Sequence, residues 1–177
     1  EIDPKSAEAH LALASAAFHR HDMGVFRTEA DRIVELSPND ALRLASAGIL
    51  VAYSGDWEKG MSLMAKAIEL NPHHQTWYHF AYFYDAYRQG LDEEALAAAQ
   101  KLNLPEFFWA HQVLAAAHAQ LGMTDKATDA IAALLELYPG YTIADMIDMH
   151  RTYNHGDDLI TRMADGLRKA GLPEGTE

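Results

Sequence analysis

Apolar residues recur along the chain with the spacing of a helix. Leu63, Ala67 and Leu70 stand at positions i, i+4 and i+7, and a similar series begins at Ile131 and continues through Leu134. This spacing places apolar side chains on one face of an α-helix. The strict alternation of apolar and polar residues that is typical of a half-buried strand is absent. The pattern therefore predicts an all-α protein.

Prolines divide this helical pattern into segments of nearly equal length. The six prolines of the chain are Pro4, Pro38, Pro72, Pro105, Pro139 and Pro173. Successive prolines are 34, 34, 33, 34 and 34 residues apart. Because proline cannot continue a helix, each proline is expected to follow the end of one.

Glycines mark the middle of most periods. They are Gly55, Gly90, Gly122 and Gly156, and His21 takes the corresponding place in the first period. Glycine suits the left-handed residue that ends a helix, and an acid soon afterwards can cap the next helix. Asp56, Asp125 and Asp157 are such acids. Two marks in each period predict two helices, so the chain is expected to form an α-α superhelix (solenoid) of antiparallel helical hairpins.

The repeat register gives the expected domain organisation. Four repeats are predicted over residues 7–141, and a C-terminal capping hairpin and tail over residues 142–177. The four repeats are residues 7–40, 41–74, 75–107 and 108–141. Residues 1–6 are interpreted as the remnant of a preceding repeat, so the chain is expected to be a piece of a longer protein. The third repeat is irregular, because its second helix is about two residues short.

Small residues indicate where helices approach closely. Ala14, Gly48 and Ala115 occupy equivalent places in three repeats. A large side chain at these places would hold two helices apart. We therefore expect all three residues to be buried between helices.

Composition excludes several classes of function. The 177 residues carry a formal net charge of −12, which argues against nucleic acid as a partner because nucleic acid needs a basic surface. No apolar run of 18 or more residues occurs, so no membrane insertion is expected. Cysteine is absent, which excludes disulfides and thiolate chemistry. The expected setting is cytoplasmic.

Catalytic and cofactor motifs are missing from the sequence. It has no phosphate-binding loop, nucleophile elbow or dinucleotide fingerprint. Acidic pairs such as Asp157-Asp158 stand at expected helix starts, where acids stabilise the helix dipole. The chain is therefore predicted not to be an enzyme, to have no catalytic residues and to bind no cofactor.

Ten histidines raise the question of a metal site. His111 and His118 are seven residues apart on one helix face. A zinc site usually needs three or four convergent ligands, and no group of histidines meets that standard. No metal is expected, although His111 and His118 could shape a binding groove or respond to pH near 6.

The repeated phrases resemble the tetratricopeptide repeat (TPR). The best match runs from Ala47-Gly48 through Gly55-Asp56-Trp57 to Ala67-Ile68-Glu69-Leu70-Asn71-Pro72. A second match runs from Leu114-Ala115 through Leu121-Gly122 to Leu134-Leu135-Glu136-Leu137-Tyr138-Pro139. The resemblance covers nearly the whole chain. It implies a right-handed superhelix whose concave groove receives a protein or peptide partner.

A narrower resemblance involves bacterial signalling proteins. Phe107-Phe108-Trp109-Ala110-His111 and the closing Gly166-Leu167-Arg168-Lys169-Ala170-Gly171 look like the C-terminal repeats that follow a class III adenylate cyclase domain or a winged-helix domain. This resemblance implies the interaction region of a larger signalling protein. The alternative is an oligomerisation scaffold for an upstream domain, with a possible homodimer.

The TPR resemblance also implies which side chains line the groove. First helices line it in this family, and the matching positions are Leu11, Ser15, Phe18, Leu42, Ile49, Tyr53, His79, Phe83, Tyr87, Trp109, Gln112 and Ala116. Such a surface would be aromatic and apolar, and buried aromatic side chains anchor interfaces well. The alternative is that these rings only pack neighbouring helices. The charged clamp of chaperone-binding members is absent, since its places hold residues such as Leu11, Ser15 and Phe80.

One segment is unusually aromatic. Seven of the eleven residues from Trp77 to Tyr87 are Phe, Tyr or Trp. A helix that is aromatic on every side is not expected to bury all its rings in one core, so some rings should face the groove or a partner. The alternative is that a bulky helix compensates for the irregular third repeat.

Overall fold

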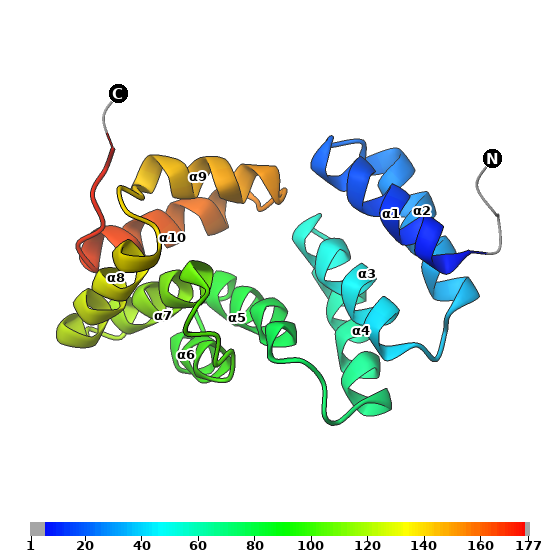
Figure 1. The fold of residues 1–177 in the computed structure, drawn as a ribbon, viewed down its shortest axis with the longest axis horizontal. Helices are drawn as coiled ribbons and strands as arrows, with labels where there is room; N and C mark the ends of the chain where they lie inside the picture. Colours follow the sequence, from blue (N-terminus) through cyan, green and yellow to red (C-terminus); the bar gives the residue numbers. More distant parts are fainter. Residues whose placement is uncertain (1–5, 176–177) are drawn as a thin grey trace. The chain divides into compact units, whose positions relative to one another are not determined.

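The computed structural model describes residues 6–175, and all regular structure in that range is helical (Figure 1). The elements are α1 (Ala7–His19), α2 (Met23–Leu36), α3 (Ala41–Tyr53), α4 (Trp57–Leu70), the 3-10 helix η1 (Thr76–Tyr78), α5 (His79–Arg88), α6 (Asp92–Gln100), α7 (Phe108–Gln120), α8 (Thr124–Leu137), α9 (Ile143–Thr152) and α10 (Asp157–Lys169). Consecutive helices form hairpins, as the period predicts. The predicted remnant at residues 1–6 lies outside the described residues except for Ser6, whose hydroxyl caps α1.

Second helices bury their side chains with one spacing. Counted from the first buried residue, the core positions are i, i+4 and i+7. They are Phe26, Ala30 and Ile33 in α2, Gly60, Met64 and Ala67 in α4, and Ala127, Ile131 and Leu134 in α8. This spacing keeps one helix face against the first helix of the same hairpin.

Close helix packing occurs where small residues predict it. Ala14 and Ala115 are buried, and Gly48 lies so close to α4 that an added Cβ would stand 3.0 Å from the carbonyl oxygen of Gly60. Gly60 is tighter still, because its Cβ would meet the backbone of Ala52 at 2.5 Å. The prediction that Ala14, Gly48 and Ala115 are buried is confirmed.

Left-handed residues end the first helices of the first four hairpins. Gly55, Gly90 and Gly122 have φ of 99°, 77° and 70°, and His21 takes the same conformation with φ 59°. The fifth hairpin differs, since Gly156 has φ −67° and the left-handed residue is Asn154 with φ 56°. The prediction for Gly156 is wrong because α9 ends at Thr152, which brings the turn forward onto an asparagine.

Helix caps follow the sequence only in part. The carboxylate of Asp56 accepts a hydrogen bond from the backbone N–H of Lys59, as expected of an N-cap. Asp125 and Asp157 are wrong as caps, because each lies inside the first turn of its helix. At those positions their charge stabilises the helix dipole.

The third hairpin contains the shortest second helix. α6 has nine residues, whereas α2, α4 and α8 have 14 each. Its core positions are nevertheless filled, by Ala95, Ala99 and Leu102. Leu102 lies beyond the end of α6 but is fully buried at the i+7 place. The hairpin thus keeps its core side chains although it loses helical residues.

Contacts divide the structure into two compact units. Unit 1 extends to Ala81 and includes the short segment Thr152–His155. Unit 2 comprises Tyr82–Arg151 and the chain from Gly156 onward. α1 to α4 belong to unit 1, whereas α6, α7, α8 and α10 belong to unit 2.

Candidate functional site

Unit 1 presents an open face formed by its first helices. Leu11 and Ser15 on α1 and Ile49 on α3 are half-exposed, and Leu42 on α3 has 51 % of its surface accessible. α1 and α3 pack side by side, so these four side chains define what we call the α1–α3 face. His79, another predicted groove residue, is half-exposed at the start of α5.

Two other predicted groove residues of unit 1 lie in its core. Phe18 is fully buried, and its ring is 5.2 Å from that of Phe26 in an edge-to-face arrangement. Tyr53 is 4 % exposed, with its ring 4.3 Å from that of His155. Burial raises the pKa of Tyr53 well above its ordinary value, so its hydroxyl stays protonated.

The segment Thr152–His155 is held in unit 1 by polar contacts. The side-chain amide of Asn154 donates a hydrogen bond of 3.0 Å to the carbonyl oxygen of Phe18. Its oxygen lies 2.6 Å from Nδ1 of His21, the left-handed residue after α1. Asn154 therefore satisfies backbone and side-chain groups where α1 ends.

Unit 2 buries every predicted groove residue that it contains. Phe83, Tyr87, Gln112 and Ala116 are fully buried, and Trp109 is 8 % exposed. These side chains come from α5 and α7, which are first helices like α1 and α3. The C-terminal hairpin of the same chain contacts four of them, because Trp109 and Gln112 lie against α9 and Tyr87 and Ala116 lie against α10.

A buried polar cluster joins α7 to this hairpin. The amide nitrogen of Gln112 lies 2.9 Å from Nε2 of His150, and the hydroxyl of Tyr141 donates a 2.7 Å hydrogen bond to the amide oxygen of Gln112. Burial lowers the pKa of His150 to about 3. The imidazole is therefore neutral and accepts the hydrogen bond from Gln112. The rings of Tyr84 and Trp109 flank it at 5.6 and 6.0 Å.

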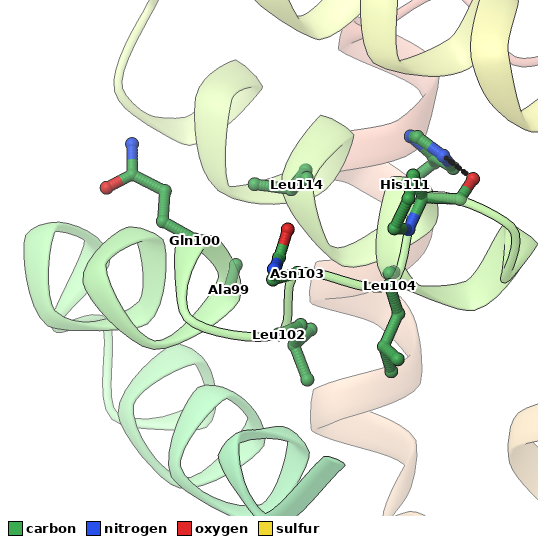
Figure 2. Close-up of a pocket in the computed structure, with 9 residues that line it drawn as sticks. Ala99, Gln100, Leu102, Asn103, Leu104, His111 and Leu114 are labelled. Carbon is green, nitrogen blue, oxygen red and sulfur yellow. Dashed lines mark hydrogen bonds between the residues drawn. The ribbon is translucent and has the colours of Figure 1, made fainter. Parts of the chain in front are cut away.

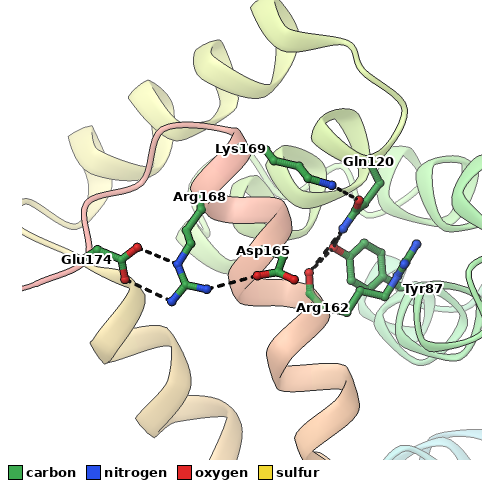
Figure 3. A network of polar contacts seen from close by, with 7 residues as sticks. All are labelled: Tyr87, Gln120, Arg162, Asp165, Arg168, Lys169 and Glu174. Carbon is green, nitrogen blue, oxygen red and sulfur yellow. Dashed lines mark hydrogen bonds and ion pairs between the residues drawn. The ribbon is translucent and has the colours of Figure 1, made fainter.

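α10 lies against α7 and the end of α5 (Figure 3). The hydroxyl of Tyr87 donates a 3.0 Å hydrogen bond to the main-chain carbonyl of Arg162, and the amide of Gln120 donates one of 3.0 Å to the same hydroxyl. The guanidinium of Arg162 stands 4.9 Å above the Tyr87 ring and pairs with Asp92 at 2.5 Å. Lys169 donates to the amide oxygen of Gln120 at 2.9 Å. Burial raises the pKa of Tyr87 to about 12, which keeps this donor protonated.

α10 is also the most deeply buried second helix. Each other second helix buries three residues, whereas α10 buries six. They are Leu159, Ile160, Met163, Ala164, Gly166 and Leu167. At Gly166 an added Cβ would stand 2.5 Å from the hydroxyl of Tyr87 and 3.3 Å from the carbonyl oxygen of Ala116. A larger residue here would displace the Tyr87 hydroxyl and press on the backbone of α7.

A small open cavity of about 270 Å³ lies where α6 ends early (Figure 2). Leu102, Leu104 and Leu114 contribute to its mainly apolar lining. At its edge, Nε2 of His111 lies 2.9 Å from the carbonyl oxygen of Pro105. Its lining comes from the end of α6, the following loop and the start of α7.

The two histidines considered for the groove have different surroundings. His118 is buried in α7, and burial, with a smaller effect of Lys126, lowers its pKa. His111 is half-exposed beside the cavity. Within residues 6–175, no three His, Asp or Glu side chains are grouped so that they could hold a metal ion. No helix of that range combines the length and apolarity needed to cross a membrane.

Sequence reasoning missed the residues that cover the groove positions. Gln120, Arg162 and Gly166 join α10 to α7, and His150 reaches Gln112 from α9. One signal was available, because the apolar residues of 157–169 all lie on one side of the helix and the charged residues all lie on the other. A helix with so complete a separation buries its apolar side against neighbouring helices. The sequence does not indicate which helices those neighbours are.

Comparisons with known proteins identify the fold. No protein-family model and no curated protein matches the chain. Among solved structures, PilW, a type IV pilus biogenesis factor, is similar with a TM-score of 0.70 and 15 % identity, over 94 % of this chain and 83 % of that one. MamA from Desulfovibrio magneticus RS-1 is similar with a TM-score of 0.63 and 18 % identity, over 93 % and 92 %.

YrrB, a TPR protein with an unusual peptide-binding site, is similar with a TM-score of 0.59 and 18 % identity, over 94 % of this chain and 87 % of that one. At such identities the likeness concerns the fold. The predicted all-α solenoid of helical hairpins is confirmed, and the chain has the fold of a TPR protein.

Proposed function

We propose that the chain is a protein-binding module whose α1–α3 face docks a peptide segment of a partner protein. The observation that carries this proposal is the exposure of Leu11, Ser15, Leu42 and Ile49 on packed first helices. In unit 2, the groove positions of α7 are covered by another helix of the chain. A face of this kind that is left open is suited to receive a segment from outside.

The chemistry of the α1–α3 face favours an apolar ligand. Three of its four side chains are aliphatic, and Ser15 is small and uncharged. Burying aliphatic surface stabilises a complex by roughly 25 cal/mol per Å² before the entropy cost of binding. YrrB, which has this fold, contains a peptide-binding site, and this supports peptide binding here.

A peptide display selection tests the proposal. Peptides selected against the wild-type chain are measured for affinity by fluorescence polarisation with Leu42→Asp, Ile49→Asp and Leu70→Asp variants. Leu70 is the matched control, since it is 41 % exposed in the same unit but lies on a second helix. The two variants on the α1–α3 face should weaken binding at least tenfold, because a charge replaces an apolar contact. Equal affinity for all three variants would contradict the proposal.

A narrower form of the proposal concerns the protein context. The resemblance of Phe107–His111 and of the closing segment to repeats in bacterial signalling proteins supports an interaction region that serves an adenylate cyclase-like or DNA-binding domain. Determining the complete open reading frame tests this form separately. An open reading frame without such a domain would reject it and leave peptide binding untouched.

A further inference from the structure

α10 is held in unit 2 in the way a bound ligand is held. Tyr87 and Gln120 direct polar atoms at the main-chain carbonyl of Arg162, at 3.0 and 3.4 Å (Figure 3). The guanidinium of Arg162 makes two further contacts, a cation–π contact with the ring of Tyr87 and a salt bridge with the carboxylate of Asp92. The surface therefore contacts both backbone and side chain of one residue of α10.

We propose that Tyr87, Ala116 and Gln120, which we call the α5–α7 face, form a helix-binding surface that takes an amphipathic partner helix with the pattern of α10 in place of α10 itself. This inference rests on the proposed function, because it treats first-helix faces as binding surfaces. It adds the kind of partner. The α5–α7 face shares no residue with the α1–α3 face.

The apolar side of the expected partner helix follows from the buried residues of α10. Ile160, Met163 and Leu167 stand at i, i+3 and i+7 and are buried, with Leu159 beside them. This is the spacing of the anchors that an amphipathic helix lays into a groove. A partner helix needs apolar residues at the same three places.

Two further positions make the surface selective. Asp92 and the ring of Tyr87 both attract a cation at the position of Arg162. The side chains of Arg162 and Asp92 are only 31 % and 23 % exposed, respectively, so solvent screens their attraction less than at an open surface. Four residues later, the contact at Gly166 disfavours any larger residue, because a Cβ there would stand 2.5 Å from the Tyr87 hydroxyl and would displace it. The partner helix is therefore specified as carrying Arg, and four residues later Gly.

Because α10 is part of the same chain, a free partner helix has to compete with it for the α5–α7 face. A linked helix has an effective concentration in the millimolar range, so a free helix of equal affinity does not displace it at micromolar concentration. Displacement requires a partner that binds more tightly or a change that weakens α10. The experiment uses the second route.

The probe is a fluorescein-labelled synthetic peptide of residues 156–171, and the receptor is the full chain with Gly166→Leu. Leucine at this place collides with Tyr87 and the backbone of α7, so α10 should leave the α5–α7 face. Hydrogen exchange of residues 159–169 reports its departure. The peptide should bind this variant at least tenfold more tightly than the wild-type chain.

Matched controls isolate the contact. Thr161→Leu adds similar bulk to an exposed position of α10 and should leave the peptide as weakly bound as by the wild-type chain. A peptide with Gly166→Leu should fail to bind. Adding Tyr87→Phe to the receptor removes the hydroxyl that bonds the Arg162 carbonyl, and peptide affinity should fall about three- to tenfold.

If the Gly166→Leu chain does not fold, Arg162→Glu replaces it, since repulsion from Asp92 weakens α10 without a backbone collision. Equal binding of the peptide to all chains would place it elsewhere and overturn the proposal. Unchanged exchange protection of α10 in a folded Gly166→Leu chain would overturn it as well. So would a folded chain with α10 released that does not bind the peptide. None of these results depends on Leu42 or Ile49, so failure here is distinguishable from failure of the proposed function.

Discussion

The first helices α1 and α7 have equal lengths but different surroundings. Each has 13 residues, yet α1 buries four of them and α7 buries eight. Leu11 and Ser15 of α1 are half-exposed, whereas Gln112 and Ala116, at matching groove places of α7, are fully buried. A repeat position therefore fixes where a side chain points but not whether solvent reaches it.

The difference arises from a segment that is distant in the sequence. α10 follows α7 by about 40 residues and covers its groove side, while α1 and α3 have no such helix among their packing partners in unit 1. A groove prediction made repeat by repeat treats the two faces alike. The structure separates an open face from an internally occupied one.

The largest effect expected from this comparison is on core stability. Phe83→Ala should lower the free energy of unfolding by about 3–5 kcal/mol, because it removes a fully buried ring. Leu42→Ala should change it by less than about 0.5 kcal/mol, because Leu42 is half open to solvent. Urea denaturation measures both, and comparable losses would remove the distinction between the faces.

The next effect concerns pH and His150. Its folded-state pKa of about 3 lies below the ordinary value of 6.5, so the unfolded chain binds a proton that the folded chain rejects. Its contribution to stability is therefore constant above pH 6.5 and is lost as pH falls toward 3, by about 1.4 kcal/mol per pH unit. Between pH 6.5 and 4.5 this amounts to about 2 kcal/mol, because half of the unfolded chains already carry the proton at pH 6.5.

His150→Gln is the matched variant for this slope. Glutamine does not titrate and can still bond Gln112, so the variant should lose less stability than the wild-type chain over the same range. Denaturation at pH 6.5, 5.5 and 4.5 measures the difference between the two proteins. Parallel curves would show that His150 is accessible to protons in the folded state.

The smallest expected effect compares two ion pairs. Arg162→Ala should cost about 1–2 kcal/mol, since it removes a partly buried pair with Asp92 and the contact with Tyr87. Lys59→Ala should cost less than about 0.5 kcal/mol, because the Lys59–Asp31 pair is about half exposed. Equal costs in thermal melts would argue that the Arg162 contacts do not hold α10.

Local features of the sequence predicted the hairpins well. Prolines and glycines act within one or two turns of chain, and the left-handed conformations of Gly55, Gly90 and Gly122 follow from them. Even the departure at His21 fell in the expected place. Asn154 was missed because the nearby Gly156 looked like the stronger turn residue.

The candidate site was less predictable, for a physical reason. Phe18 and Tyr53 are apolar or aromatic, so they satisfy both a groove pattern and a core pattern. The choice between these depends on what packs against them, and for Tyr53 that includes His155, a residue about 100 positions away. Helical periodicity contains no information about such a contact.

Leu102 has a consequence for how repeat arrays change in length. It reaches its core place from a non-helical stretch, so the third hairpin tolerates a shorter α6 and the next hairpin resumes at α7 with an ordinary helix. A deletion at a repeat boundary is thus absorbed where it occurs. A protein engineer could join modules of unequal length by retaining one apolar residue at the i+7 place rather than restoring the full period.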